Sequence, residues 1–132
     1  MKKILIVEDN ISMRYLLERI FKDSYIVRTA DDGLTAMVLL RKGYIPDVII
    51  TDINMPSING KELIAYLKKS SLYCNIPIIT LSSLSNEELE FDNLFEDIDD
   101  IIQKPFEPKE LIQRVSSVVK KHNNLSVISS QY

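Results

Sequence analysis

Short apolar runs alternate along this chain with longer stretches in which apolar residues recur every three or four positions. With Pro77 and Thr80 accepted inside the fourth run, the runs occupy residues 4–7, 26–27, 48–50, 76–81 and 101–102. Continuous apolar runs of this length are typical of strands buried on both faces, as parallel strands in an α/β sheet are. The pattern therefore predicts five parallel strands.

The stretches between these runs predict amphipathic helices, because their apolar residues line one side of a helix. Residues 85–88, Ser-Asn-Glu-Glu, fit a capping box that opens the fourth helix, and Pro108 suits the first turn of the fifth. Arg41 is the next residue in the series Leu34, Met37 and Val38, and we expect its charged group to lie in solvent. The predicted apolar stripes are Met13, Leu16, Leu17, Ile20 and Phe21; Leu34, Met37 and Val38; Leu63, Ile64 and Leu67; Leu89 with Phe95; and Leu111, Ile112, Val115, Val118 and Val119.

Five strand–helix units in alternation predict an α/β fold, a five-stranded parallel sheet with helices on both faces and right-handed crossovers. The units fill residues 1–121, which we expect to form one domain, and residues 122–132 suggest a polar tail or the start of a linker. In open sheets of this kind, ligands bind beyond the carboxyl ends of the strands. Candidate chemistry is therefore to be sought at that edge.

The composition, 45% apolar and 27% charged residues, is that of one ordinary globular domain. No apolar run approaches the roughly 20 residues of a membrane span. The basic and apolar start resembles a signal peptide, but its apolar part is four residues long and ends at Glu8 and Asp9, so we interpret it as a first strand. We therefore expect a cytoplasmic protein that binds no membrane.

Charge and cysteine content exclude two further classes of site. A formal net charge of -3 argues against direct nucleic-acid binding. Cys74 is the one cysteine and His122 the one histidine, so neither an internal disulfide nor a zinc site is expected.

Charged and polar residues follow the predicted strands at the edge where ligands bind. Glu8 and Asp9 follow the first strand, Asp52 closes the third, Ser82 closes the fourth, and Lys104 follows the fifth. Three carboxylates brought together repel one another unless a cation joins them, and Mg²⁺ prefers such oxygen ligands. An aspartate can also accept a phosphoryl group, whose charge a metal and a lysine then neutralise. Each residue alone has an ordinary explanation; their coincidence at one edge favours a phosphoryl-accepting site.

Four short motifs occur in order along the chain: Ile-Val-Glu-Asp-Asn at 6–10, Asp-Ile-Asn-Met-Pro at 52–56 with Gly60, Pro-Ile-Ile-Thr-Leu-Ser at 77–82, and Lys-Pro-Phe at 104–106. Together they resemble the receiver domain of bacterial two-component response regulators over about residues 2–121. The resemblance implies a flavodoxin-like (βα)5 receiver fold. It also implies a phosphorylation-regulated signalling domain, not an enzyme, which catalyses only its own phosphoryl transfer and dephosphorylation.

Carried over to this sequence, the resemblance implies that Asp52 is the phospho-acceptor. The implied Mg²⁺ ligands are Asp9 directly, Glu8 through water, Asp52, and the backbone carbonyl of Asn54. Lys104 would pair with the phosphoryl oxygens, and the Ser82 hydroxyl would move onto the phosphoryl group.

The resemblance also implies a phosphodonor and one backbone feature. The donor would be a sensor histidine kinase or a histidine phosphotransfer protein. The peptide bond before Pro105 would be cis.

Four positions depart from the family's pattern. Ile101 stands where an aromatic is usual, residues 97–98 are Asp-Ile where Gly-Ala is usual, and Ser83 replaces the usual Ala. These changes leave the chemistry at Asp52 untouched. They affect how a change at the site is transmitted to the surface of the domain. Because isoleucine is stiff at its first torsion, we expect Ile101 to stay packed and residues 82–86 to shift instead.

Residues 84–100 contain eight acidic residues and no lysine or arginine, whereas the remainder carries 16 basic against 11 acidic residues. A solvated acidic helix is the usual explanation for such a segment. The resemblance places this helix on the output surface, so we also consider an unknown output target that presents a basic patch.

Three other functions compete with a phosphorylated receiver. A phosphatase of the haloacid-dehalogenase type would need its nucleophile after the first strand and an acid where Asn54 stands. A flavin carrier would need a phosphate-binding loop after the first strand, where Glu8 and Asp9 would repel phosphate. A receiver-like interaction module that works without phosphorylation remains an alternative.

Overall fold

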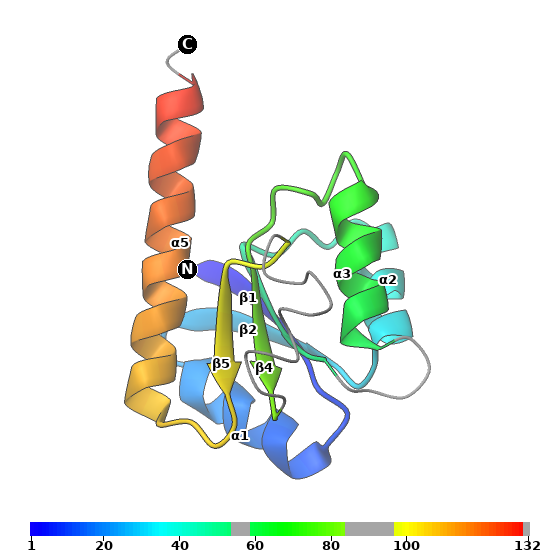
Figure 1. Cartoon of the computed structure of the whole chain (residues 1–132), viewed down its shortest axis with the longest axis vertical. Coiled ribbons are helices and arrows are strands. Elements are labelled where there is room, and N and C mark those ends of the chain that lie inside the picture. The colour runs from blue at the N-terminus through cyan, green and yellow to red at the C-terminus, as the bar shows by residue number, and fades with distance from the viewer. Residues whose placement is uncertain (54–58, 84–96, 131–132) are drawn as a thin grey trace.

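One parallel sheet organises the chain (Figure 1). The computed structural model describes residues 1–53, 59–83 and 97–130. The strands run in the order β2-β1-β3-β4-β5, and every neighbouring pair is parallel. The five predicted strands and the α/β class are confirmed. The strand bounds are β1 Lys2–Val7, β2 Tyr25–Ala30, β3 Val48–Asp52, β4 Ile78–Ser82 and β5 Asp100–Gln103.

Helices cover both faces of this sheet (Figure 1). The helices are α1 Ile11–Phe21, α2 Gly33–Arg41, α3 Gly60–Lys69 and α5 Pro108–Ser130. Side chains of α1 and α5 pack with one core cluster, and those of α2 and α3 pack with the other. The predicted fourth helix and its capping box at 85–88 lie outside the described residues.

The central strands are continuously apolar because both of their faces are buried. In β1, Ile4 and Ile6 belong to the core under α1 and α5, whereas Leu5 and Val7 belong to the core under α2 and α3. Alternate residues of a strand point to opposite faces, so two cores require an unbroken apolar run. β1 is therefore an interior strand, and its carboxyl end lies beside that of β3.

Side chains outside the apolar stripes fix where three helices begin. Asn10, Asp32 and Asn59 each accept a hydrogen bond from the backbone N–H three residues later, at the starts of α1, α2 and α3. These bonds satisfy N–H groups that the helix leaves unpaired. Pro108 is the first residue of α5, as predicted.

The apolar stripe predicted for α2 is wrong at two of its three residues, and only Met37 packs against the core. Leu34 and Val38 are 51% and 43% exposed, and the helix instead buries Gly33, Ala36 and Leu40. Apolar residues occur nearly all round this helix, so their spacing does not define one face. The small residues lie toward the sheet, where they allow close approach.

The stripe predicted for α3 is confirmed, because Leu63, Ile64 and Leu67 are buried. The stripe of α5 is confirmed as well, with Leu111 and Val115 fully buried. In α1 the prediction holds apart from Leu16, which is 44% exposed.

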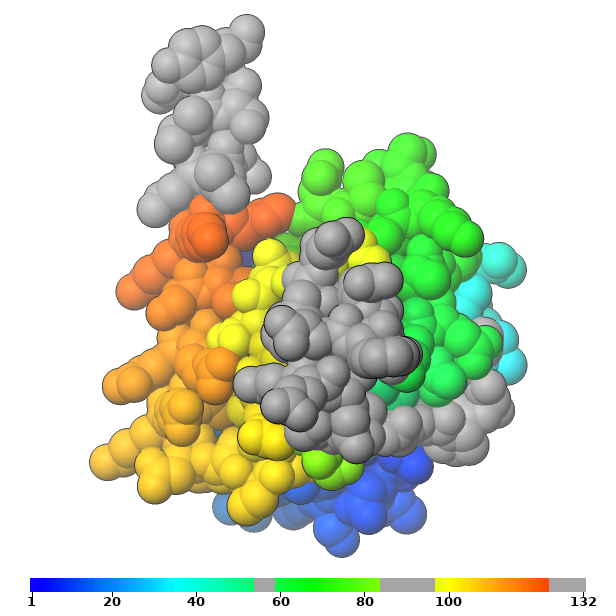
Figure 2. Space-filling model, in the orientation of Figure 1, coloured from blue at the N-terminus to red at the C-terminus, as the bar shows by residue number. Residues whose placement is uncertain are grey.

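Helix α5 runs further than the sequence suggested. Residues 122–130, expected to be a polar tail or linker, continue the helix to Ser130 (Figure 1). A domain boundary at residue 121 stays a prediction. In the space-filling view α5 forms one flank of the molecule and α3 the opposite one (Figure 2). Within the described ranges, no helix combines the length and apolar character needed to cross a membrane.

Candidate functional site

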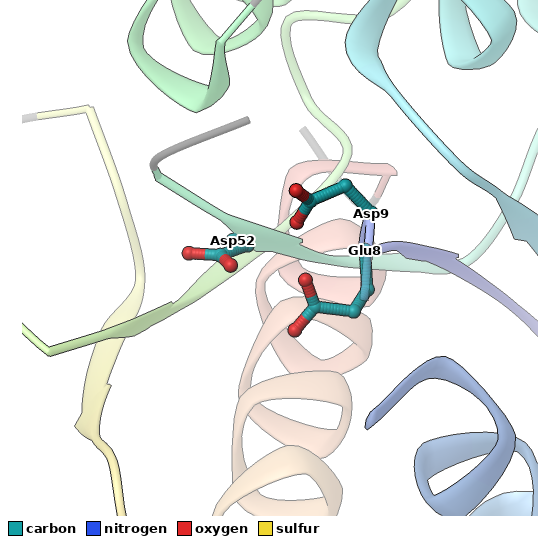
Figure 3. Close-up of side chains that lie close together, drawn as sticks. All are labelled: Glu8, Asp9 and Asp52. Atoms are coloured by element: carbon teal, nitrogen blue, oxygen red, sulfur yellow. The ribbon is translucent and has the colours of Figure 1, made fainter. Parts of the chain in front are cut away.

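Three carboxylates meet at the carboxyl end of the sheet (Figure 3). Glu8 and Asp9 directly follow β1, and Asp52 is the last residue of β3. Because Val7 and Thr51 are partners in the parallel β1–β3 pair, the two strands end side by side. One carboxylate oxygen from each acid lies within 4.8 Å of the others. The structure thus brings together the three predicted acidic residues.

These carboxylates differ in their exposure to water. Glu8 is 1% exposed and Asp52 is 9% exposed, whereas Asp9 lies in solvent. Burial, and next the charge of Asp52, raise the pKa of Glu8 from its ordinary value of 4.5 to about 7, although the hydrogen bond from Lys104 acts in the opposite direction. Near neutral pH, in the absence of a metal, the Glu8 carboxyl therefore retains part of its proton.

Lys104 joins two of the acids from the far side of β4. Its Nζ lies 3.1 Å from Glu8 Oε1 and 3.0 Å from Asp52 Oδ2. Burial alone would lower the pKa of Lys104, but its hydrogen bonds and the charges of Asp52 and Glu8 outweigh this effect and raise it. The lysine is therefore a cation held between the carboxylates, at the point predicted for it.

The backbone at the end of β5 places this lysine. The Lys104 N–H donates to the Ser82 carbonyl at 2.8 Å. The Lys104–Pro105 peptide bond is cis, which confirms that expectation.

Ser82 closes β4 beside this cluster. It is 1% exposed and pairs with Gln103 of β5, while its neighbour Leu81 pairs with Asp52. Parallel pairing thus sets Ser82 at the same sheet edge as Asp52. Asn54, whose carbonyl was predicted to be a metal ligand, lies outside the described residues.

Arg14 is a site residue that the sequence reasoning missed. Its Nη1 donates to the Glu8 carbonyl at 2.9 Å, which ties the first turns of α1 to the end of β1. The Asn10 N–H also lies 3.4 Å from Glu8 Oε2. An arginine one turn after a helix cap is a weak signal by itself, and only the fold shows that it reaches the acidic pair.

Gly60, which the sequence presents only as part of a motif, has a steric role. A Cβ at this position would lie 2.3 Å from the Asp52 carbonyl oxygen and 2.6 Å from the Ile53 Cα. The Gly60 N–H donates to the Ile53 carbonyl at 2.7 Å, and the Thr51 hydroxyl donates to the Asp52 carbonyl at 2.9 Å. The first residue of α3 therefore packs directly against the backbone of Asp52, the candidate acceptor, and has no room for a side chain.

A third and smaller hydrophobic cluster lies beside β5. Ile101 is only half-buried, and with Ile98 it packs against the buried Ile53 in a small separate cluster. Two acids of the 84–100 segment are engaged. Asp99 accepts the Ile78 N–H at 2.8 Å, and Arg114 binds Asp100 through Nε at 2.8 Å and Nη2 at 2.5 Å.

The donor set suits a hard divalent cation. At the strand ends, three carboxylates lie together, and the ammonium group of Lys104 binds two of them. The carboxylates offer oxygen ligands, which Mg²⁺ prefers. An aspartate in this setting can act as a nucleophile towards phosphorus. The arrangement therefore fits metal-assisted phosphoryl transfer onto a protein carboxylate.

Comparisons with known proteins agree with this geometry. The family model described as the response regulator receiver domain matches residues 4–116. The chain is 36% identical over 117 residues to the sensor histidine kinase TmoS of Ectopseudomonas mendocina, covering 89% of this chain and 12% of that protein. It is 37% identical over 129 residues to the probable transcriptional regulator ycf27 of Guillardia theta, covering 97% and 49%. The chain thus spans about half, or much less, of these relatives.

Solved structures are similar in fold as well. A signal receiver domain of a histidine kinase from Syntrophus aciditrophicus superposes with a TM-score of 0.84 and 30% identity, covering 92% of each chain. The chemotaxis protein CheY4 of Vibrio cholerae gives a TM-score of 0.81 and 33% identity, covering 89% of this chain and 98% of that one.

Proposed function

Because this chain belongs to the response regulator receiver domain family, we propose that it accepts a phosphoryl group on Asp52. The observation that carries the proposal is the cluster of Glu8, Asp9 and Asp52 within 4.8 Å, with Lys104 bound to two of its members. The donor is a phosphohistidine on a sensor histidine kinase or a histidine phosphotransfer protein. An Asp52 oxygen forms the new bond to phosphorus as the bond to the donor nitrogen breaks.

Glu8, Asp9 and Asp52, with the Asn54 carbonyl, would hold Mg²⁺. When bound, the ion supplies positive charge that neutralises the phosphoryl oxygens. Lys104, already 3.0 Å from Asp52 Oδ2, pairs with one of these oxygens, and the Ser82 hydroxyl donates to another. Arg14 keeps the Glu8 backbone in place. The chain acts as a signalling switch in the cytoplasm and not as an enzyme with turnover of an external substrate.

Asp9 is the exposed acid of the cluster, so we place the approach of the phosphodonor on its side. Beside this approach, α1 presents Ile11 and Tyr15, which are 74% and 60% exposed and lie one helical turn apart. Exposed apolar side chains next to a polar site suit a protein partner. We therefore assign the kinase contact to this end of α1.

We also propose that the output target, which is unknown, presents a basic patch to this chain. Among the acids of residues 84–100 that the structure describes, Asp99 and Asp100 are engaged internally, and Asp97 is exposed. Asp97 is therefore the described acid that is best placed to meet a basic partner.

Phosphoryl uptake tests the proposed acceptor. Incubated with Mg²⁺ and acetyl phosphate, the protein should gain one acid-stable, base-labile phosphoryl group, measured by intact-mass spectrometry. Asp52→Asn should abolish uptake, and Asp9→Asn should greatly weaken both uptake and Mg²⁺ binding by removing a charged ligand. Asp23→Asn, which changes an exposed aspartate in the turn after α1, serves as the matched control and should label like wild type. Equal labelling of the Asp52→Asn protein would contradict the assignment.

A further inference from the structure

Thr80 has an unusual environment in the middle of β4. The residue is fully buried, yet its hydroxyl has no hydrogen-bond partner. Among the described parts of the chain, it is the one buried side-chain polar atom in this situation. Buried hydroxyls are normally bonded, so an unpaired one requires an explanation.

The neighbours of Thr80 supply no partner. On β3 it pairs with Thr51, whose own hydroxyl donates to the Asp52 carbonyl. On β5 it pairs with Ile101, an apolar residue. Valine has nearly the same shape as threonine and would fill this position without burying a polar group. Threonine thus makes the observed conformation less stable than it need be.

The position of Thr80 relates it to the site. Alternate residues of a strand share a face, so Thr80 and Ser82 lie on the same face of β4, one step apart. Ser82 is the hydroxyl that, in the proposed function, moves towards the phosphoryl group. A displacement of the end of β4 that carries Ser82 would therefore act on the same face as the Thr80 hydroxyl.

We propose that Thr80 is a positioning residue for Ser82: its hydroxyl is unpaired in the resting conformation and acquires a hydrogen-bond acceptor when the end of β4 shifts towards phosphorylated Asp52. The resting state then lacks a bond that the active state contains, and this difference favours the movement of Ser82. The side chain of Ile101, the β5 partner of Thr80, is apolar and cannot form this hydrogen bond. The two hydroxyls that we connect, those of Thr80 and Ser82, both lie on β4. The inference rests on the proposed function.

Two substitutions separate this role from simple packing. Thr80→Val removes the hydroxyl and keeps the shape, whereas Thr80→Ser keeps the hydroxyl and removes a methyl group. The probe is beryllium fluoride with Mg²⁺, which stands in for the phosphoryl group on Asp52. For each protein, the dissociation constant of beryllium fluoride is measured by calorimetry, and Tm is measured without it.

Thr80→Val should raise Tm of the unliganded protein and weaken beryllium fluoride binding about tenfold, equivalent to about 1.4 kcal/mol. Thr80→Ser should lower Tm because it leaves a cavity, yet bind beryllium fluoride like wild type. Any other combination overturns the inference. Higher Tm with unchanged binding would mean that the hydroxyl is unpaired in both states, and lower Tm or loss of folding would mean that it is paired at rest. Failure of the wild-type protein to bind would instead refute the proposed function, and this inference with it.

Discussion

The β1–β3 end of the site and the β4–β5 side of the same sheet are built in different ways. At the first, Lys104 lies within 3.1 Å of both Glu8 and Asp52, and Gly60 packs directly on the Asp52 carbonyl. At the second, Thr80 has an unpaired hydroxyl and Ile101 is half-buried. From this contrast we predict that Asp52 keeps a fixed geometry and that the β4–β5 side is the one that responds to it. Substitutions on the two sides should therefore have different consequences.

The largest effect is expected at the rigid end, from Gly60→Ala. The new methyl group would collide with the Asp52 backbone at 2.3 Å, so either α3 or the acceptor strand has to move. We expect a loss of about 3 kcal/mol or more in the free energy of unfolding, measured by urea denaturation. Gly43→Ala is the control, because Gly43 has a φ of 99° but nothing within 4 Å of an added Cβ. A loss at Gly60 no greater than that at Gly43 would remove the steric argument.

On the responsive side, Ile101→Ala should cost less. Isoleucine to alanine in a full core costs about 2–5 kcal/mol, and a half-buried residue should fall at about 1–2 kcal/mol. Phosphoryl uptake at Asp52 should be largely intact, since the Ile101 side chain packs against Ile53. Ile102→Ala, at a 2% exposed neighbour, should lie in the higher range. The distinction between the two sides fails if Ile101→Ala blocks uptake.

A smaller effect concerns pH. The folded metal-free protein retains the Glu8 proton up to about pH 7, whereas the unfolded chain loses it near the ordinary value of 4.5. The folded state therefore binds more protons between these values, and the free energy of unfolding should fall as pH rises through this window. Glu8→Gln should flatten this dependence, as measured by urea denaturation at about pH 5 and about pH 7.5 with a chelator present. An equally steep dependence in the variant would show that another group is responsible.

The smallest effect is expected at the surface. Association with an output target that presents a basic patch should weaken as salt rises, because screening shortens the reach of charge. Asp97→Asn should reduce this dependence, whereas Asp23→Asn should leave it unchanged. Titrations of the purified target at several ionic strengths provide the measurement. Binding that is insensitive to salt would count against an electrostatic output surface.

The strands and the acidic cluster could be predicted from the sequence for one physical reason. Unbroken apolar runs require two buried faces, and parallel strands bring their carboxyl ends to one edge. The order of residues along the chain is therefore sufficient to place Glu8, Asp9 and Asp52 together. The spacing of Leu63, Ile64 and Leu67 likewise identifies the buried face of α3.

Other features could not be predicted, because they depend on how the helices and strands pack together. In α2, apolar residues on several sides leave the spacing ambiguous, and the small residues Gly33 and Ala36 are the buried ones. Arg14 reaches Glu8 only through the docking of α1 on β1. In the sequence, Thr80 is merely an exception within an apolar run; its missing partner emerges only when its neighbours are known.

Helix α5 extends beyond the contacts that hold it on the sheet (Figure 1). Arg114 ties it to β5 through Asp100 and the Ile101 carbonyl, and Val115 and Val119 pack it on the core. From Val119 the helix continues for about 16 Å to Ser130, at about 1.5 Å per residue. A tilt of α5 by about 5° would displace Ser130 by about 1.4 Å relative to Val119. A movement of β5 that tilts α5 would therefore be largest at the end of the helix.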